Sequence, residues 1–195
     1  MSGYKERALL DGAQRVFARD GYSRASIQSL ATEASVSTRT IYNRYCSKEA
    51  LFRAVILDNA NRVAECEIAL ADQLLGRITD LRRDLIAFGV AWATPDPASQ
   101  SHFAMIRQVS ADADHIEPDV LAAWRHAGPE RVRSAIAEHL LAMRRQRLLK
   151  VKDGQIAAVH LIQLTAGTVT SIASTTGIEH LVTEGVDVFL AACGR

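Results

Sequence analysis

The stretch Ala25–Phe52, ASIQSLATEASVSTRTIYNRYCSKEALF, decides the fold of the N-terminal part of this chain. Ser26 precedes apolar residues spaced at i, i+3, i+4 and i+7, and this spacing predicts a capped amphipathic helix. Ser37 precedes a second helical pattern, whose inward positions are Ile41 and Tyr45 at i, i+4. Ser47 is the expected N-cap of a third helix, without the reciprocal glutamate of a capping box. Two short helices joined by a tight turn indicate a helix-turn-helix.

The outward positions of the second short helix carry no acidic residue. They offer cations, hydroxyls, an amide and a phenol, which are donors suited to phosphates and to the edges of bases. The sequence therefore predicts that this helix binds DNA. The residues on this face are Thr38, Arg39, Thr40, Tyr42, Asn43 and Arg44.

Residues 7–55 resemble the N-terminal domain of the TetR family of transcriptional regulators. The family often has glycine where Ser35 and Arg39 stand, so either Ser35 lies in the turn at positive φ, at a cost of about 1 kcal/mol, or the turn differs slightly from that of the family. Arg39 bears on which DNA sequence is read rather than on whether DNA is bound. The positions that carry the resemblance are Ala13, Phe17, Gly21-Tyr22, Ser26-Ile27, Leu30-Ala31, Ala34, Val36-Ser37, Thr40-Ile41-Tyr42, Tyr45, Ser47-Lys48-Glu49 and Leu51-Phe52.

The resemblance implies a homodimeric regulator, most often a repressor, which binds a palindromic operator in double-stranded DNA and responds to a small molecule. At the matching motif positions, Ser26, Thr40, Tyr42 and Lys48 are expected to hold the phosphate backbone. Arg39, near the start of the second short helix, is the expected base-reading residue, followed by Asn43 and Arg44. The complete predicted DNA-binding set is Ser26, Ser37, Thr38, Arg39, Thr40, Tyr42, Asn43, Arg44 and Lys48.

Charge is distributed unevenly along the 195 residues, although the net charge is only +1. Residues 1–55 contain nine Lys/Arg and five Asp/Glu, whereas residues 56–195 contain 14 and 17. The cationic end thus coincides with the helix-turn-helix, as contact with phosphates requires. A chance imbalance on solvated helices is the alternative explanation, and the motif argues against it.

Few other functional classes find support. The three cysteines and six histidines show no metal-ligand or redox spacing, and no catalytic motif or cofactor-binding loop is present. We therefore expect no catalytic residue, no metal and no cofactor. No signal peptide and no apolar run long enough to span a membrane is evident, so a cytoplasmic protein without a membrane partner is expected.

The remaining sequence predicts an all-α fold. A content of 48% hydrophobic residues with only 6% aromatics suits packed helices, and no β-type alternation occurs. The helix that starts at Ser47 meets no proline or glycine before Gly76. It therefore joins a helix-turn-helix domain, residues 1–47, to a helical ligand-binding and dimerisation domain, residues 48–195.

Two features of the second domain indicate what it could bind, a second subunit and a small-molecule effector. The apolar helix expected over Gln155–Thr175 is rich in small residues, which allows close approach of a second subunit; an ordinary buried core helix is the alternative. Bulky side chains and a few polar ones on the middle helices are candidates for an effector pocket, although each is also compatible with a structural role. These candidates are Phe88, Trp92, His102, Phe103, Met105, Trp124, His160 and Gln163.

Two other functions remain open at this point. One is a helical ligand-binding or assembly protein that acts through a protein partner and no longer reads DNA. The other is a helical enzyme, for which the sequence offers no acid-base or metal constellation. Thr40, Tyr42 and Lys48 argue against the first alternative, because the matching positions of the family contact phosphate.

Overall fold

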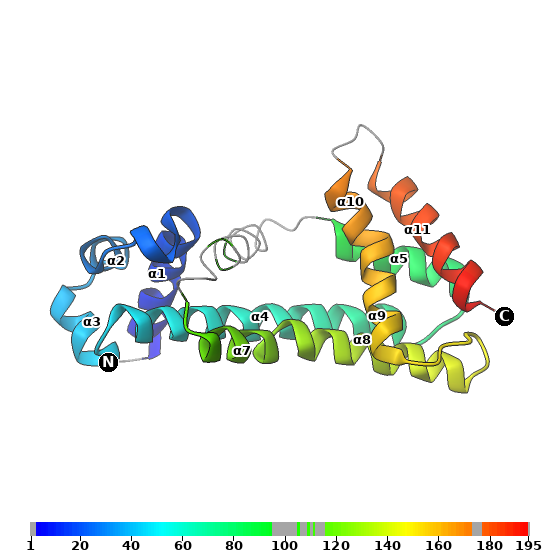
Figure 1. Ribbon diagram of the computed structural model, residues 1–195, viewed down its shortest axis with the longest axis horizontal. Coiled ribbons are helices and arrows are strands. Elements are labelled where there is room, and N and C mark those ends of the chain that lie inside the picture. Colours follow the sequence, from blue (N-terminus) through cyan, green and yellow to red (C-terminus); the bar gives the residue numbers. More distant parts are fainter. Residues whose placement is uncertain are drawn as a thin grey trace. The chain divides into compact units, whose positions relative to one another are not determined.

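The computed structural model describes residues 3–94, 105, 109, 111, 116–172 and 177–194. Within these residues the chain forms helices joined by turns, with no strand, and the predicted all-α fold is confirmed (Figure 1). The elements are α1 (Gly3–Arg24), α2 (Ile27–Glu33), α3 (Thr38–Tyr45), α4 (Lys48–Leu75), α5 (Leu81–Ala93), α7 (Pro118–Ala127), α8 (Pro129–Arg145), α9 (Gly154–Ile162), the π-helical segment η2 (Gln163–Gly167), α10 (Thr168–Ser171) and α11 (Ile178–Cys193).

The chain divides into two compact units. The first contains the described residues up to Val63 and those from Met105 to Pro129; the second contains those from Ala64 to Thr94 and from Glu130 onward. The long helix α4 therefore belongs to both units. The compact units differ in extent from the domains expected from the sequence, because the first half of α4 and all of α7 pack with α1–α3.

The core of the first unit is built around the start of α4 (Figure 1). Phe17 and Phe52 meet edge to face, with ring centroids 5.0 Å apart and planes at 78°. Burial of such side chains stabilises the fold by about 1.5–3 kcal/mol each. This core fixes the orientation of α3 within the unit. Its buried members on α1–α4 include Leu9, Ala13, Val16, Phe17, Leu30, Ala31, Ile41, Leu51, Phe52 and Val55.

The three predicted serine caps are present. The hydroxyls of Ser26, Ser37 and Ser47 accept hydrogen bonds from the backbone N–H groups three residues later, at 3.0, 3.1 and 3.1 Å. Each cap satisfies an N–H that the helix itself leaves without a partner. Local chemistry therefore sets where α2, α3 and α4 begin.

The turn between α2 and α3 is a Schellman motif. The N–H of Ser35 donates to the carbonyl of Thr32 at 3.1 Å, and that of Val36 donates to the carbonyl of Ala31 at 2.9 Å. Ser35 has φ 53°, the first of the two alternatives expected from the sequence, and this left-handed conformation is strained for a residue with a Cβ atom. The helix-turn-helix thus contains strain at its corner.

Ser35→Gly is expected to raise the free energy of unfolding by about 0.5–1 kcal/mol, because glycine adopts positive φ without steric cost. Ser35→Ala is the matched control, since it removes the hydroxyl and keeps Cβ, and it is expected to give no such gain. Urea denaturation of the three proteins measures the difference. A glycine variant that is no more stable than the alanine variant would contradict the assignment of strain.

An ion-pair network joins α1 to α4 within the first unit. The guanidinium of Arg7 donates to both carboxylate oxygens of Asp58, at 2.8 and 2.6 Å. Arg62 approaches the same carboxylate at 3.1 Å and donates to Gln14 at 2.8 Å. A bidentate arginine–carboxylate pair fixes geometry as well as charge. The network therefore attaches the outer helix α1 to the first half of α4.

The second unit is packed closely around a π-helical segment. In place of the helix expected over Gln155–Thr175, the chain forms α9, η2 and α10 in succession. The expectation of one regular helix to Thr175 was wrong. The helix ends at Ser171, and the backbone of Ile172 is extended. Buried Thr165 donates its hydroxyl to the carbonyl of Leu161 at 2.7 Å. Threonine bonds of this kind to the carbonyl four residues earlier often accompany a local distortion of a helix.

Glycines permit the close approach of α5 and α11 to η2. An added Cβ at Gly89 would lie 2.6 Å from Val182, and one at Gly185 would lie 1.8 Å from the carbonyl oxygen of Leu164. The backbones are therefore in contact at a distance that no larger residue allows. The buried residues around this contact include Leu85, Phe88, Ile136, Leu140, Leu161, Val186 and Phe189.

Glu67 on α4 is a half-buried carboxyl group in the second unit, and burial raises its pKa from 4.5 to about 7. Since the folded state binds its proton more tightly than the unfolded state, the chain loses stability as the pH rises from about 4.5 to about 7. Above that range the ionised carboxylate remains a constant cost.

Glu67→Gln is expected to raise the free energy of unfolding by about 1–3 kcal/mol at pH 8, and to have little effect at pH 4.5. Chemical denaturation at the two pH values measures this difference. Glu65→Gln is the control, because Glu65 is exposed on the same helix and its replacement is expected to change stability by less than about 0.5 kcal/mol. A gain for Glu67→Gln that does not depend on pH would refute the burial argument.

Candidate nucleic-acid interface

Helix α3 presents the predicted polar face to solvent. Ile41 is fully buried on its inner side, whereas Tyr42 keeps 52% of its surface exposed, and Arg39, Asn43 and Arg44 are also exposed. The apolar contact through Ile41 anchors the helix while its other side chains remain available. This is the arrangement that a recognition helix requires.

The first turn of α3 is held by its own hydroxyl groups. The hydroxyl of Ser37 accepts the backbone N–H of Thr40 at 3.1 Å and lies 2.8 Å from the hydroxyl of Thr40. These contacts fix the side chain of Thr40 beside the helix N-terminus, next to half-buried Thr38. Ser26 has the equivalent role in α2, where it and Ser29 cap each other's backbone groups.

The two arginines of α3 differ in their surroundings. Arg44 donates to the carboxylate of Glu6 on α1 at 2.5 Å, and this hydrogen bond is the main reason why its pKa is raised. Arg39 makes no ion pair with any other residue that the structure describes. Arg39 is therefore the cation of α3 that is available to a ligand, in the first turn of the helix.

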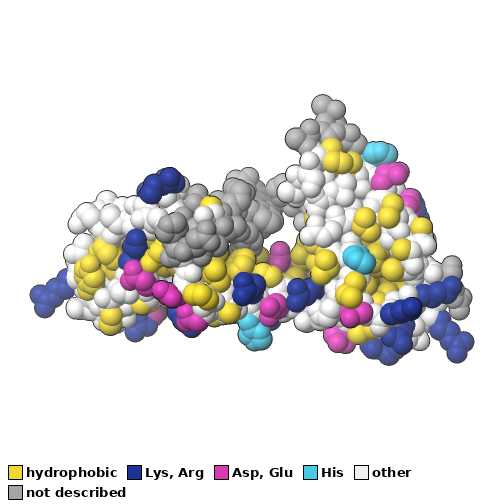
Figure 2. Space-filling view, in the orientation of Figure 1, with side chains coloured by type: hydrophobic (Ala, Val, Ile, Leu, Met, Phe, Trp, Pro, Cys, Tyr) yellow, Lys and Arg dark blue, Asp and Glu magenta, His cyan; other side chains and the backbone are white. Residues whose placement is uncertain are grey.

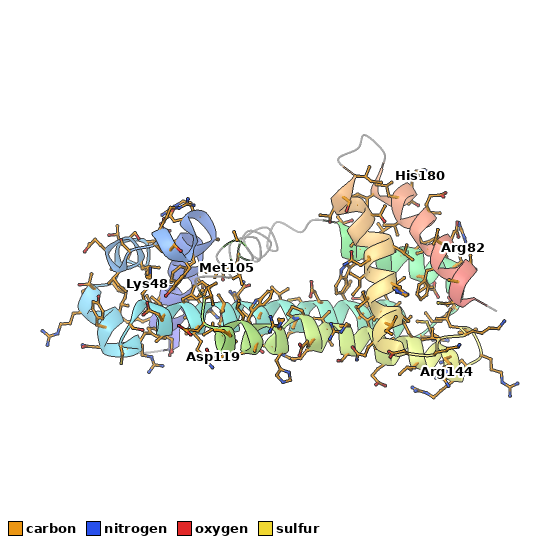
Figure 3. The ribbon with its side chains drawn as sticks, viewed as in Figure 1. Lys48, Arg82, Met105, Asp119, Arg144 and His180 are labelled. Atoms are coloured by element: carbon orange, nitrogen blue, oxygen red, sulfur yellow. The ribbon has the colours of Figure 1, made fainter. Side chains whose placement is uncertain are left out.

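Lys48 lies at the start of α4, close to the loop between α1 and α2 (Figure 3). Its ammonium group donates to the carbonyls of Tyr22 and Ala25 at 3.1 and 3.2 Å and lies 4.6 Å from the centroid of the Tyr22 ring. Two of its three N–H groups are thereby used within the protein. Lys48 both supports the loop before α2 and keeps one donor for an anion.

Tyr22 completes this arrangement. Its hydroxyl donates to the carboxylate of Glu49 at 2.9 Å, and burial together with that bond raises the pKa of Tyr22 to about 12. The phenol therefore stays protonated at neutral pH and holds Glu49 beside Lys48. A substitution at Lys48 consequently changes the loop as well as the surface charge.

The predicted effector residues that the structure describes are divided between the two units. Phe88 and Trp92 form an aromatic pair in the second unit, with centroids 5.3 Å apart, and Phe88 is fully buried there. Met105 and Trp124 pack in the apolar cluster of the first unit. His160 and Gln163 are exposed, whereas His102 and Phe103 lie outside the described residues.

The described part of the chain contains no group of histidine, cysteine, aspartate and glutamate residues arranged to hold a metal ion. It also contains no helix that is long and apolar enough to cross a membrane.

Sequence reasoning missed one residue of the interface, Glu6. It lies 38 positions before Arg44, and no local pattern connects the two. The contact depends on how α1 packs across the helix-turn-helix, which only the three-dimensional structure shows.

Two family models match this chain. The model for bacterial regulatory proteins of the tetR family covers residues 9–55, and the model for the AefR-like transcriptional repressor, C-terminal domain, covers residues 83–195. The second match alone spans more than half of the chain, and the first coincides with the helix-turn-helix.

Among curated proteins, the regulator BetI of Rhizobium meliloti is 29% identical over 148 residues, which are 76% of this chain and 62% of BetI. The repressor Rv1474c of Mycobacterium tuberculosis is 32% identical over 77 residues, which are 40% of each chain. The matched segments thus span less than two thirds of either relative.

The fold as a whole is similar to that of a TetR-family transcriptional regulator from Mesorhizobium loti, with a TM-score of 0.85 and 24% identity over 100% of this chain and 98% of the other. This identity supports the shared fold only. The exposed helix α3, the helical second unit and the two matching family models together show that the chain belongs to the TetR family of transcriptional regulators, which are DNA-binding proteins rather than enzymes.

Proposed function

We propose that the protein is a ligand-responsive repressor that acts in the cytoplasm as a homodimer on a palindromic operator. The observation that carries the proposal is the outer face of α3, which is capped, anchored through Ile41 and free of acidic residues. The AefR-like repressor match and the relative Rv1474c, itself a repressor, support repression rather than activation.

In this proposal α3 enters the major groove of each half-site. Arg39 donates to base edges from the first turn of the helix, with Asn43 and Thr38 beside it. Ser26, Ser37, Thr40, Tyr42 and Lys48 contact the phosphate backbone on either side. The hypothesis of a protein that acts through a protein partner without reading DNA ranks second, because Thr40, Tyr42 and Lys48 occupy the motif positions from which the family contacts phosphate.

Binding to a mixed-sequence duplex at several salt concentrations tests whether this surface binds phosphate at all. The logarithm of the association constant is expected to fall linearly with the logarithm of salt concentration, with a slope of about −0.9 for each phosphate contacted. Affinity that does not depend on salt, or that Thr40→Ala and Tyr42→Phe together leave unchanged, would favour the protein-partner hypothesis.

The second unit offers a surface for dimerisation. Ile156 and Val159 on α9 and Val188 on α11 keep 55%, 40% and 54% of their surface exposed. Figure 2 shows apolar side chains gathered over α9 and α11 on the visible face of this unit. An exposed apolar face of this kind indicates an interaction site, and a palindromic operator requires two copies of the chain.

Ile156→Glu and Val188→Glu are each expected to weaken self-association at least 100-fold, because they place a charge in the proposed interface. Sedimentation equilibrium measures the dissociation constant. Ala122→Glu adds the same charge to an exposed position of α7 in the first unit and is expected to leave the dimer intact. A wild-type protein that is monomeric at micromolar concentration would refute the dimer proposal.

Response to an effector needs a connection between the two units, and α4 runs from the first into the second. We propose that an effector bound in the second unit shifts α4 and with it the spacing of the two recognition helices. A tenfold loss of operator affinity requires about 1.4 kcal/mol of coupling. Phe88, Trp92, His160 and Gln163, all in the second unit, remain the candidate contacts.

A further inference from the structure

Glu6 connects the first turns of α1 to the end of the recognition helix. Its carboxylate accepts a hydrogen bond from the guanidinium of Arg44 at 2.5 Å, and the side chains of the two residues are 33% and 52% exposed. Exposed pairs of this kind contribute only about 0–1 kcal/mol to stability. The contact therefore matters less for the stability of the fold than for the hydrogen bonds that Arg44 can offer to DNA.

Two other carboxylates of the first unit pair with cations of α1. Glu33 pairs with Arg15 on α1 at 2.7 Å, and Asp58 pairs with Arg7 at 2.6 Å. Among the ion pairs of the described residues, the pair between Arg44 and Glu6 is the one that involves a cation of α3. The polar face of α3 is itself free of acid, and Glu6 places a negative charge against its last turn, at Arg44.

This charge has two physical consequences for DNA binding. A guanidinium that is bonded to a carboxylate has fewer N–H groups to offer to a phosphate, and the carboxylate repels phosphates that approach α3. Non-cognate complexes depend almost entirely on phosphate contacts, whereas a cognate complex also contains base contacts. Restraint of one cation therefore weakens non-cognate binding more than cognate binding.

We propose that Glu6 is a specificity-determining residue of the DNA interface, which restrains Arg44 and thereby lowers the affinity for non-cognate DNA. The proposal rests on the proposed DNA-binding function of α3. Glu6 touches no DNA itself and acts through Arg44, so it is a positioning residue. Selective binding is achieved here partly by repulsion of wrong partners, a general route to specificity.

The test compares Glu6→Gln, Arg44→Ala and the double variant with the wild-type protein on two duplexes. One duplex has a mixed sequence, and the other is the sequence that the wild-type protein enriches from a random library. Affinities are measured by fluorescence anisotropy between 50 and 300 mM salt, a range of roughly sixfold chosen to resolve the slope. Glu33→Gln is the matched control, because it removes the same charge from a pair that does not involve α3.

Glu6→Gln is expected to strengthen binding to the mixed duplex about fivefold near 100 mM salt and to steepen the salt slope by about 0.9, the value for one additional phosphate contact. Binding to the enriched duplex is expected to change less, so the specificity ratio falls. In the Arg44→Ala background the same substitution is expected to leave the slope unchanged.

Four results would overturn the proposal. An unchanged slope in Glu6→Gln would show that Arg44 gains no contact. An equal response in Glu33→Gln, or in the Arg44→Ala background, would show a general effect of charge. Failure of every variant to bind either duplex would overturn the proposed function as well, whereas DNA binding with an unaltered specificity ratio overturns the role of Glu6 alone.

Discussion

Gly185→Ala is expected to lower the free energy of unfolding of the second unit by about 3 kcal/mol, because the new methyl group overpacks the contact between α11 and η2. The added Cβ would lie 1.8 Å from the carbonyl oxygen of Leu164, which is a backbone atom and cannot turn away. Relief requires α11 to move as a whole. Chemical denaturation followed by circular dichroism measures the loss.

Gly167→Ala is the matched control for this prediction. Its Cβ would also meet an atom at short range, but that atom is the side-chain oxygen of Gln163, an exposed residue with a flexible side chain. Alanine is favoured over glycine in a helix by about 0.5–1 kcal/mol, so this variant is expected to be as stable as the wild type or more stable. Equal stability of the two alanine variants would show that the contact at Gly185 is not tight.

Arg39→Ala is expected to weaken binding to the preferred DNA sequence by roughly 1–3 kcal/mol, or about 5- to 150-fold, and to relax the preference at one position of each half-site. The reason is the position of Arg39 in the first turn of α3 and its lack of an ion pair within the described residues. Fluorescence anisotropy with the preferred duplex and its single-base variants measures both effects.

Arg82→Ala removes the same charge from the second unit, where Arg82 pairs with Asp187 at 2.7 Å. It is expected to leave the preference for sequence unchanged. If Arg39→Ala instead weakens binding to the preferred duplex and to mixed-sequence DNA by equal factors, Arg39 contacts phosphate and another residue of α3 reads the bases.

The features that could be predicted from the sequence are those with local causes. Serine caps, the left-handed conformation of Ser35 and the uninterrupted helix α4 each follow from residues a few positions apart. The outward face of α3 was predictable for the same reason, because the burial of Ile41 follows from helical spacing.

The features that could not be predicted depend on contacts between residues far apart in the chain. The pairing of Arg44 with Glu6 and that of Arg7 with Asp58 span 38 and 51 positions. The π-helical turn around Thr165 depends on the glycines of α5 and α11 that pack against it. The proposed effector residues were chosen by size and polarity. These properties do not indicate which of the residues lie in the same compact unit.

The central claim is that two copies of α3 read a symmetric DNA sequence. Selection from a random duplex library with the purified wild-type protein at moderate salt tests it most directly. Enrichment of a sequence with two-fold symmetry and two half-sites about one helical turn apart is expected. A folded protein that enriches no sequence, both as purified and after unfolding and refolding to remove any bound ligand, would contradict it.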